Sequence, residues 1–403
     1  MSKVKLGTVI DSCLGKMLDA AKNKGEYEPY LANLNVRWGD FDLDNLSQMR
    51  FESYEQERYG IKYGDLIMCE GGEPGRCAIW RDELPNMKIQ KALHRIRPHD
   101  CLDVRYLYYW FLLAGKNGWL NRYFTETTIK HLPGDSLKDV EIDLIDLPLQ
   151  KGIADVLSSL DDKIRHNNRI CRELEAMAKT IYDYWFVQFD FPDENGKPYR
   201  ASGGEMVWNE RLKREIPKGW SVGKLADIAN ITMGQSPAGE SYNETGEGII
   251  FYQGRTDFGL RFPTPRMYTT EPTRFAEKGD ILLSVRAPVG DLNLAMEPCC
   301  IGRGLAALNS KIGSQMHLFY TLSGFKQLFD VMDGNGTTFG SITKDILFDM
   351  NVVIPSNPQL NDFEKHVNPI ETKIQVCEQE NRELTKLRDW LLPMLMNGQA
   401  RVE

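Results

Sequence analysis

Basic and amide side chains that stand next to glycines are the residues of this sequence best suited to recognition chemistry. Gln253-Gly254-Arg255-Thr256 follows an apolar run, Arg286 precedes an Ala-Pro-Val-Gly turn, and Arg303 stands between two glycines. Glycine allows a backbone to approach a ligand closely. Arginine can bond bidentately to guanine, and asparagine or glutamine to adenine, in the major groove of DNA. These loops therefore predict the direct reading of bases.

The first half of the chain carries a corresponding set of cations and amides. The candidate DNA-contacting residues of both halves are Asn33, Asn35, Arg37, Arg76, Lys88, Gln90, Lys91, Lys130, Gln253, Arg255, Arg286, Arg303 and Lys344. The alternative for each is an ordinary surface cation or an amide that satisfies a turn. Lys91 and Arg303 stand above the others, because an internal duplication places a cation at the same point in both halves.

Motifs for catalysis and for metal binding are not found in the sequence. It contains no Walker loop, no Gly-x-Ser-x-Gly elbow, no His-Glu-x-x-His and no Asn-Pro-Pro-aromatic element. Its six histidines are scattered, and its eight cysteines form no Cys-x-x-Cys pair. Pro192-Asp193 resembles the start of a nuclease motif, but no acidic-x-Lys follows it. We therefore predict that the chain is not an enzyme by itself and binds no metal or cofactor.

Length and charge limit the classes of protein to which the chain can belong. With 403 residues it should hold two or three domains. Acidic residues outnumber basic ones by 57 to 49, a net charge of −8, which argues against coating nucleic acid by bulk charge. No apolar run approaches the roughly 20 residues of a membrane span. These features, with cysteines that show no disulfide pattern, predict a cytoplasmic protein whose DNA-binding patches are local.

The sequence contains a long internal duplication, whose matches keep the same order at offsets of 210 to 219 residues. The matching segments are Lys5-Leu6 with Lys224-Leu225, Tyr63–Met68 with Lys278–Leu283, Ile89–Leu93 with Ile301–Leu305, Thr127-Thr128-Ile129 with Thr337-Thr338-Phe339, and Asp161–Ile164 with Glu371–Ile374. Each half begins with about 140 residues of short apolar runs broken by Gly, Pro and Asn, typical of a strand-rich domain. A long helical pattern follows in each half.

Both helical patterns place apolar residues at alternating steps of four and three, which predicts a coiled-coil seam. The predicted seam residues are Leu157, Leu160, Ile164, Asn167, Cys171, Leu174, Ile181, Ile370, Ile374, Cys377, Asn381, Leu384 and Leu391. The sequence Asn368-Pro369-Ile370-Glu371 predicts an N-cap for the regular part of the second helix. Pro393 should limit its far end, and Gly398 suits a terminator.

Because a globular domain separates the two helices in sequence, we expect them to pair antiparallel, with a globular domain near each end. One attractive register sets Asn167 against Asn381, which also sets Cys171 against Cys377. Leu157 to Trp185 would span roughly 42 Å at ~1.5 Å per residue, comparable with the ~34 Å of one DNA turn. Two reading domains could then face the same side of a duplex.

The predicted fold class is α+β, with two mixed strand-rich globular domains in tandem, each followed by a long helix. The predicted boundaries are 1–148 for the first domain, 149–189 for its helix, 190–218 for a linker, 219–356 for the second domain and 357–397 for its helix. The linker assignment rests on six glycines and prolines between Asp190 and Gly219.

These features resemble the specificity subunit of type I restriction-modification systems over essentially the whole chain. The resemblance rests on Gly279–Gly290, Ile301–Leu305, Tyr184-Trp185-Phe186 and the helix Leu157–Asp161 that leads into Lys163-Ile164, together with the duplication. The sequence departs from the family pattern at the entry to the second helix. The family tends to place Pro-x-x-Glu-Gln there, whereas Ser-Asn-Pro-Gln lies between Pro355 and Leu360.

The resemblance implies that each globular domain is a target recognition domain that reads one half of a split double-stranded DNA site. The paired helices would fix the spacing, and two methyltransferase (modification) subunits would dock on them. Those subunits would use S-adenosylmethionine, and restriction (translocase) subunits would use ATP and Mg. A different class remains open, a protein–protein adaptor with two binding domains on a coiled-coil spacer. The acidic balance favours the adaptor, and the glycine-flanked cations at equivalent repeat positions favour DNA.

Overall fold

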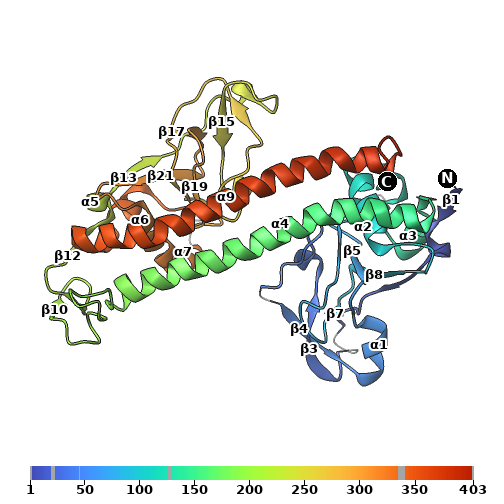
Figure 1. Cartoon of the computed structure of the whole chain (residues 1–403), viewed down its shortest axis with the longest axis horizontal. Helices are drawn as coiled ribbons and strands as arrows, with labels where there is room; N and C mark the ends of the chain where they lie inside the picture. Colours follow the sequence, from blue (N-terminus) through green and yellow to red (C-terminus); the bar gives the residue numbers. More distant parts are fainter. Residues whose placement is uncertain (1, 20–22, 45, 126–128, 335–340, 402–403) are drawn as a thin grey trace. The chain divides into compact units, whose positions relative to one another are not determined.

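The computed structural model in Figure 1 describes residues 2–19, 23–44, 46–125, 129–334 and 341–401. The chain divides into two compact units. Unit 1 comprises Met1–His166 with Asn381–Glu403, and unit 2 comprises Asn167–Glu380. Each unit therefore contains one strand-rich domain and a share of both long helices. Of the repeat matches expected from the sequence, the Thr127/Thr337 pair lies largely outside the described residues.

Unit 1 is built on three small sheets. Its strands are β1 (Ser2–Lys5), β2 (Ile10–Leu14), β3 (Glu26–Leu31), β4 (Ser47–Phe51), β5 (Leu66–Cys69), β6 (Cys77–Ile79), β7 (Lys88–Ile89), β8 (Leu93–Pro98) and β9 (Glu141–Leu144). They form a pair β1-β9, a four-stranded sheet β2-β8-β5-β6 and a three-stranded sheet β4-β3-β7. The helices of the domain are α1 (Gln56–Tyr59), α2 (Val104–Lys116) and α3 (Gly134–Asp139).

Unit 2 repeats this plan and adds strands. Its strands are β10 (Met206–Asn209), β11 (Arg214–Pro217), β12 (Ser221–Lys224), β13 (Ala229–Met233), β14 (Tyr242–Asn243), β15 (Ile249–Tyr252), β16 (Tyr268–Thr269), β17 (Phe275–Ala276), β18 (Ile281–Ser284), β19 (Leu292–Leu294), β20 (Cys299–Ile301), β21 (Leu305–Ser310) and β22 (Asn351–Ile354). Its helices, apart from the long ones, are α5 (Leu225–Ile228), α6 (Gln315–Gly324), α7 (Lys326–Gly334) and α8 (Lys344–Phe348).

The internal duplication seen in the sequence is present in the sheet topology. The order β13-β21-β18-β19 in unit 2 matches β2-β8-β5-β6 in unit 1, and the pair β12-β22 matches β1-β9. The third sheet of unit 2, β14-β16-β15-β20-β17, keeps the parallel contact of β15 with β20 that β3 makes with β7 in unit 1. Each unit is therefore an α+β domain of the same design.

Burial and capping explain why these segments form. Leu66–Cys69 and Ile281–Ser284 are fully buried, as short apolar runs in central strands should be. The Asp103 carboxylate accepts the backbone N–H groups of Arg105 and Tyr106 and so begins α2. Ser314 caps α6 in the same way. Such caps satisfy N–H groups that have no partner inside the helix.

The two long helices are α4 (Leu147–Tyr182) and α9 (Asn357–Met396), and a π-helical turn at Asp183–Val187 follows α4. α9 begins at Asn357 and continues through Pro369, so the N-cap predicted at Asn368 for the regular part of the second helix is wrong. Pro358 lies in the first turn, where a missing N–H costs nothing. The predicted end is confirmed: α9 stops three residues after Pro393, and Gly398 has a left-handed φ of 70°.

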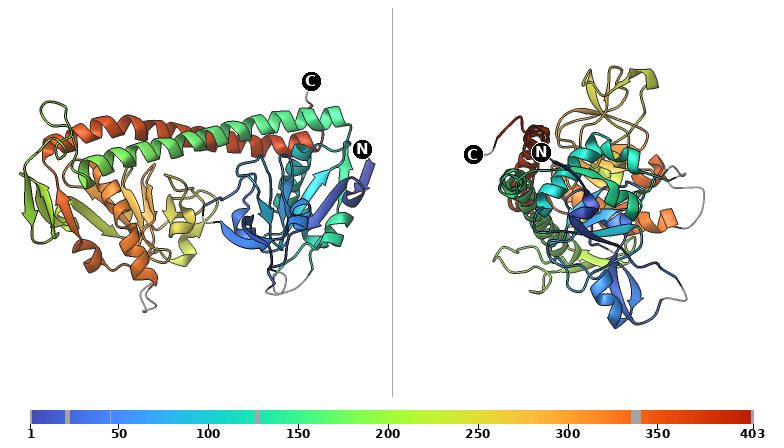
Figure 2. Two further views of the ribbon diagram at one scale, coloured as in Figure 1. Left: turned by 90° about the horizontal axis from the view of Figure 1, so that it is seen from below. Right: turned by 90° about the vertical axis from the view of Figure 1, so that its right-hand side faces the viewer.

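The portions of α4 and α9 that belong to one unit pack antiparallel, as Figures 1 and 2 show. In unit 2 the Asn167 amide donates to Glu380 at 2.8 Å, and the Cys171 thiol lies 3.9 Å from the carbonyl oxygen of Ile374. In unit 1 Arg388 of α9 reaches Asp161 of α4. All thirteen predicted seam residues are buried or half-buried.

The segment between the two repeats packs as part of unit 2. β10 and β11 pair antiparallel from Met206 opposite Pro217 to Asn209 opposite Arg214. Phe191 stacks on Trp220 with ring centroids 5.0 Å apart, and Ile216 is buried in the main core of the unit. None of the described helices combines the length and the apolar character that a membrane crossing requires.

Candidate nucleic-acid interface

Three loops of unit 2 bring four of the predicted DNA-contacting residues together. Gln253 and Arg255 follow β15, Arg286 lies in the loop between β18 and β19, and Arg303 lies in the turn between β20 and β21. These side chains line one cavity of about 330 Å³, and all four residues are exposed. We call these segments, 253–256, 286–288 and 302–304, the unit 2 loop cluster. Its residues come from strand ends that the core of the unit holds in place.

Internal hydrogen bonds fix the loop after β15. The buried Asp257 accepts the backbone N–H of Gln253 at 3.0 Å and pairs with Arg266 at 2.6 Å. Gly304 serves packing, which differs from the close approach of a ligand that the sequence predicted for it. A Cβ on Gly304 would lie 2.6 Å from the carbonyl oxygen of Gln253. Glycine at 304 therefore allows the turn to press against the end of β15.

The three arginines of the cluster differ in how they are bound. Arg255 forms an ion pair with Asp291. The side chains of Arg286 and Arg303 have neither a hydrogen bond nor an ion pair with any residue that the structure describes. Two exposed guanidinium groups with all their donors available can bind phosphate oxygens or the O6 and N7 acceptors of guanine.

Lys91 and Arg303 occupy equivalent turns. In unit 1 the backbone N–H of Leu93 donates to Gln90 at 3.1 Å, and in unit 2 the N–H of Leu305 donates to Gly302 at 3.0 Å. Each cation is the second residue of its turn and is exposed. The position shared through the duplication is therefore an exposed cation at a tight turn in both units.

In unit 1 the corresponding loops also meet, and their residues bond to one another at the place where they meet, which we call the unit 1 junction. The Asn33 amide donates to the Gly71 carbonyl at 2.7 Å, and Arg76 donates to the Asn33 carbonyl at 3.1 Å and to Glu73 at 2.8 Å. The backbone N–H of Glu70 donates to the carbonyl of Ala92, next to Lys91. Asn33 and Arg76 therefore shape this junction, and Lys91 is its exposed cation.

Other predicted contacts of unit 1 have structural partners. Lys88 is 2% exposed and pairs with Glu28 at 2.7 Å, which leaves no free ammonium for DNA. Asn35 is also buried and bonds to the backbone of Ala32 and Asp42, as a turn amide does. Arg37 is exposed but pairs with Asp42 at 3.0 Å. We leave Lys88 and Asn35 out of the interface that we propose.

Three predicted residues remain: Gln90 belongs to the turn that carries Lys91, Lys130 precedes His131, which bridges to Gly71, and Lys344 lies in unit 2. Gln90 is half-buried beside Lys91, and Lys130 is exposed. Lys344 is exposed at the start of α8, with its ammonium 5.0 Å from the ring centroid of Phe348. Lys130 and Lys344 do not line the cavity of the unit 2 loop cluster.

Two cavity residues with side-chain hydroxyl groups were absent from the predicted set. Ser236 and Thr256 also line the unit 2 cavity, and the Ser236 hydroxyl accepts the backbone N–H of Arg303 at 3.3 Å. Thr256 directly follows Arg255, so its position was available from the sequence. Ser236 lies 67 residues before Arg303. Only the pairing of β13 with β21 brings it close, and no spacing rule would have shown that.

A buried tyrosine–carboxylate–arginine cluster joins the domain to the helix pair in each unit. In unit 1 the Tyr109 hydroxyl of α2 donates to Asp161 of α4 at 2.6 Å, and Arg388 of α9 donates to the other carboxylate oxygen at 2.8 Å. Tyr109 and Asp161 are buried. We call Tyr109, Asp161 and Arg388 the unit 1 joint.

In the unit 2 joint the tyrosine and the carboxylate stand at equivalent repeat positions, whereas the arginine comes from a loop of the domain. Tyr320 of α6 donates to Glu371 of α9 at 3.2 Å. Arg261 lies 3.3 Å from Glu371 and 3.4 Å from Glu175 of α4, and it is 1% exposed. Burial raises the pKa of Glu371, although the nearby Arg261 opposes this shift. Arg261 belongs to the segment that continues from Arg255, so the loop cluster is tied to both helices.

Among the residues that the structure describes, no group of three His, Cys, Asp or Glu side chains is placed to hold a metal ion.

The long helices present some apolar side chains to solvent. Met177 of α4 is 55% exposed in unit 2, and Leu387 of α9, at the equivalent repeat position, is 43% exposed in unit 1.

Comparison with known proteins places the chain in a family. The model of the type I restriction modification DNA specificity domain matches residues 1–176 and 217–385, so it matches each half once. The chain is 29% identical over 364 residues to a putative type I restriction enzyme MjaX specificity subunit of Methanocaldococcus jannaschii, covering 87% of this chain and 83% of that protein. It is 22% identical over 413 residues to the HindI specificity subunit of Haemophilus influenzae, covering 85% and 88%.

A solved structure shows the same fold. The S subunit of a type I restriction-modification system from M. genitalium superposes with a TM-score of 0.55 at 18% identity, over 98% of this chain and 95% of that one. The family model covers both repeats, and its two matches end in α4 and α9. The duplicated α+β domains, their helices and the family match agree, and the chain belongs to the type I restriction-modification specificity subunits.

Proposed function

We propose that the chain reads a bipartite DNA site, with one recognition domain for each half-site. The observation that carries this proposal is the unit 2 loop cluster, where exposed Arg286 and Arg303 line one cavity with Gln253. The family membership implies recognition of a DNA sequence, and these loops supply the donors that base edges and phosphates accept. Lys91 is the matching exposed cation of unit 1.

We further propose that α4 and α9 act as a spacer that sets the distance between the half-sites. Both helices are continuous, with 36 and 40 residues. The joints tie each domain to them through buried side chains. A recognition domain fixed to a stiff helix pair cannot adapt freely to spacers of different length.

The modification subunits would dock on the helices, at surfaces that include the equivalent apolar positions Met177 and Leu387. Burial of exposed apolar side chains is a main source of affinity between proteins. In this proposal the chain itself has no catalytic step. S-adenosylmethionine, ATP and Mg would be used by the modification and restriction subunits, and the complex would act in the cytoplasm.

The test measures binding of the chain, purified with its modification subunits, to duplexes selected from a random library. We expect a specific duplex to bind more tightly than a random one, with an affinity that falls as salt rises. Arg303→Ala or Arg286→Ala should cost about 1 to 3 kcal/mol if the side chain reads a base, and only for the half-site that unit 2 reads.

The matched control is Lys218→Ala, which removes an exposed cation that pairs with Glu205 outside the loop cluster. It should leave the discrimination between duplexes unchanged. Equal affinity of the parent complex for selected and random duplexes would refute sequence reading. An equal loss at both half-sites for Arg303→Ala would refute the assignment of one domain to each half-site.

A further inference from the structure

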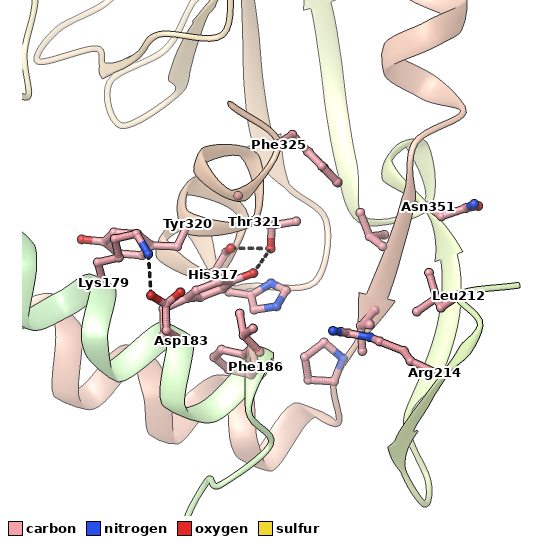
Figure 3. Close-up of a pocket in the computed structure, with 16 residues that line it drawn as sticks. Lys179, Asp183, Phe186, Leu212, Arg214, His317, Tyr320, Thr321, Phe325 and Asn351 are labelled. Carbon is pink, nitrogen blue, oxygen red and sulfur yellow. Dashed lines mark hydrogen bonds and ion pairs between the residues drawn. The ribbon is translucent and has the colours of Figure 1, made fainter. Parts of the chain in front are cut away.

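A cavity of about 300 Å³ lies in unit 2, away from the loop cluster. It is bounded by the end of α4 and its π-helical turn, by α6, by β11 and by β22. Figure 3 shows Arg214 extending from β11 toward the imidazole of His317, with Phe186 on the side of α4. The family match leaves out residues 177–216, which contain much of this wall.

Arg214 is a positive charge without a compensating carboxylate. It is half-buried, and its guanidinium lies 4.9 Å from the ring centroid of Phe189. Among the described residues it has no hydrogen bond and no ion pair. Burial lowers the pKa of Arg214, the nearby Tyr182 opposes this shift, and Arg200 adds to it. A desolvated cation of this kind favours an anion that can enter the cavity and accept its N–H groups.

The other charged groups at the cavity cannot supply that anion. Asp183 forms an ion pair with Lys179. His317 is buried, and burial lowers its pKa to about 3, so the imidazole is neutral near pH 7. Its Nδ1 atom has no hydrogen-bond partner among the described residues. The cavity therefore combines one unneutralised cation with an unsatisfied imidazole nitrogen.

Apolar side chains make up much of the remaining wall and continue outside it. Tyr182, Phe186 and Val352 line the cavity and are buried. Val187 lines the cavity and is 47% exposed, and Tyr184, three residues earlier in the same π-helical turn, is 40% exposed. A DNA phosphate would leave these apolar groups uncovered. A protein segment that carries a carboxylate next to apolar side chains would cover both kinds of surface.

We propose that this cavity binds a carboxylate, from an acidic side chain or a chain terminus, on an apolar segment of a modification subunit. The carboxylate would accept N–H groups of Arg214, and the apolar neighbours would cover Val187 and Tyr184. The proposal rests on the proposed function only in that it takes the modification subunit as the partner. The cavity would give the modification subunit a polar contact in unit 2, in addition to the apolar docking surface of the helices.

The first experiment uses small probes on the full-length chain. Binding of 3-phenylpropionate and of its neutral amide is followed by ligand-observed NMR. We expect the carboxylate to bind and the amide to bind at least about tenfold more weakly, because a buried charged hydrogen-bond pair is lost. Arg214→Gln should remove this preference. Lys213→Gln is the matched control, because Lys213 is an exposed neighbour that pairs with Glu210, and it should keep the preference.

The second experiment titrates the modification subunit onto the full-length chain. Arg214→Gln should weaken this binding at least about tenfold, while Lys213→Gln and the half-site discrimination of the assembled complex stay unchanged. Unchanged partner binding by Arg214→Gln would overturn the proposal. So would a loss of DNA affinity without a loss of partner binding, which would assign Arg214 to a phosphate. The proposed reading of DNA is tested separately, by the Arg286 and Arg303 variants.

Discussion

At the scale of single residues, the sequence identified the exposed arginines of the loop cluster as candidate DNA contacts. It could not distinguish them from basic residues that are buried in the folded protein. Lys88 and Arg303 are both cations at a strand end in corresponding regions of the two units, yet Lys88 is buried against Glu28. Glu28 lies on β3, and only the pairing of β3 with β7 brings the two together. Side-chain type shows which contacts are possible, whereas burial and partners depend on tertiary packing.

His317 provides a residue-scale prediction about pH. An imidazole titrates near 6.5 when unfolded, and burial lowers the pKa of His317 to about 3. The unfolded chain therefore takes up more protons between these values, so the free energy of unfolding falls as pH drops below 6.5. Between pH 6.5 and 5 this residue should account for a loss of about 2 kcal/mol.

The check is urea denaturation of the parent and of His317→Gln at pH 5, 6 and 7. The variant should lose less stability on acidification, by about the amount just given. The buried His94, whose pKa burial also lowers, remains in the variant and should keep part of the dependence. His366→Gln removes an exposed imidazole instead, and it should follow the parent. Identical slopes for the parent and His317→Gln would contradict the prediction.

At the scale of elements, the periodicity of apolar residues located both long helices and the residues through which they pack against each other. The steps of four and three fall on buried or half-buried positions of α4 and α9 throughout. The error was the N-cap predicted at Asn368, because α9 passes through Asn368 and Pro369 without a break. A proline inside a helix removes one hydrogen bond, and tertiary packing can compensate for it. Glu371 and Ile374 on the next turn are buried in unit 2, which holds the helix continuous there.

The seam of unit 2 predicts a specific crosslink. Cys171 and Cys377 are both buried, and Cys171 also lies beside Ile374. Burial and the adjacent Cys377 raise the pKa of Cys171 to about 12, so its thiolate is scarce at neutral pH. We expect no spontaneous disulfide, but a Cys171–Cys377 crosslink after treatment with copper phenanthroline, identified by peptide mass spectrometry.

Cys377→Ser should abolish this crosslink and leave the other cysteines unchanged. A parent protein that stays folded yet never joins these two cysteines would exclude the register in which they face each other.

The joints predict large losses of stability from small changes. Asp161→Ala removes the carboxylate that binds both Tyr109 and Arg388. The half-buried Arg388 guanidinium keeps only Asp389 as a carboxylate partner, and Tyr109 loses its acceptor, so unfolding should become easier by about 2 to 3 kcal/mol. Tyr109→Phe removes one hydrogen bond and should cost about 1 kcal/mol. Denaturant titration followed by tryptophan fluorescence measures both.

Asp155→Ala is the control on the same helix. Its side chain is 64% exposed and pairs with Arg105, so its loss should cost less than about 1 kcal/mol. Equal effects of the Asp155 and Asp161 variants would show that the joint contributes no more than a surface ion pair.

At the scale of the whole molecule, the duplication was the most informative signal in the sequence. Its nearly constant offset predicted two domains of one design, and the matching sheet orders confirm that design. The sequence did not show that each compact unit takes part of both helices. That division depends on which helical turns pack on which domain, and joints such as Tyr320–Glu371 are side-chain contacts that periodicity does not reveal.

The spacer proposal makes a prediction at this scale. One heptad inserted after His166 in α4 and another before Asn381 in α9 would fall at the boundary of the units and keep the seam in phase. Seven residues add about 10 Å of helix. The preferred gap between half-sites should then lengthen by about three base pairs, measured by selection from duplexes with graded spacers.

An insertion in α4 alone is the control, because it puts the seam out of register, and it should impair folding. An unchanged preferred gap in a folded double insertion would contradict the spacer.

Unit 1 is formed from two segments that are distant in the sequence, and this affects the order in which the two units fold during translation. Unit 1 includes a segment that begins at Asn381 and is synthesised after the whole of unit 2, because unit 2 lies between the two pieces of unit 1. Leu392 and Leu395 complete the same core as Leu6 and Leu157. During translation unit 2 should therefore reach its native state before unit 1, although unit 1 begins at the N-terminus. A nascent chain stalled before residue 381 would carry one finished recognition domain and one whose core is still open, which makes it a natural substrate for chaperones.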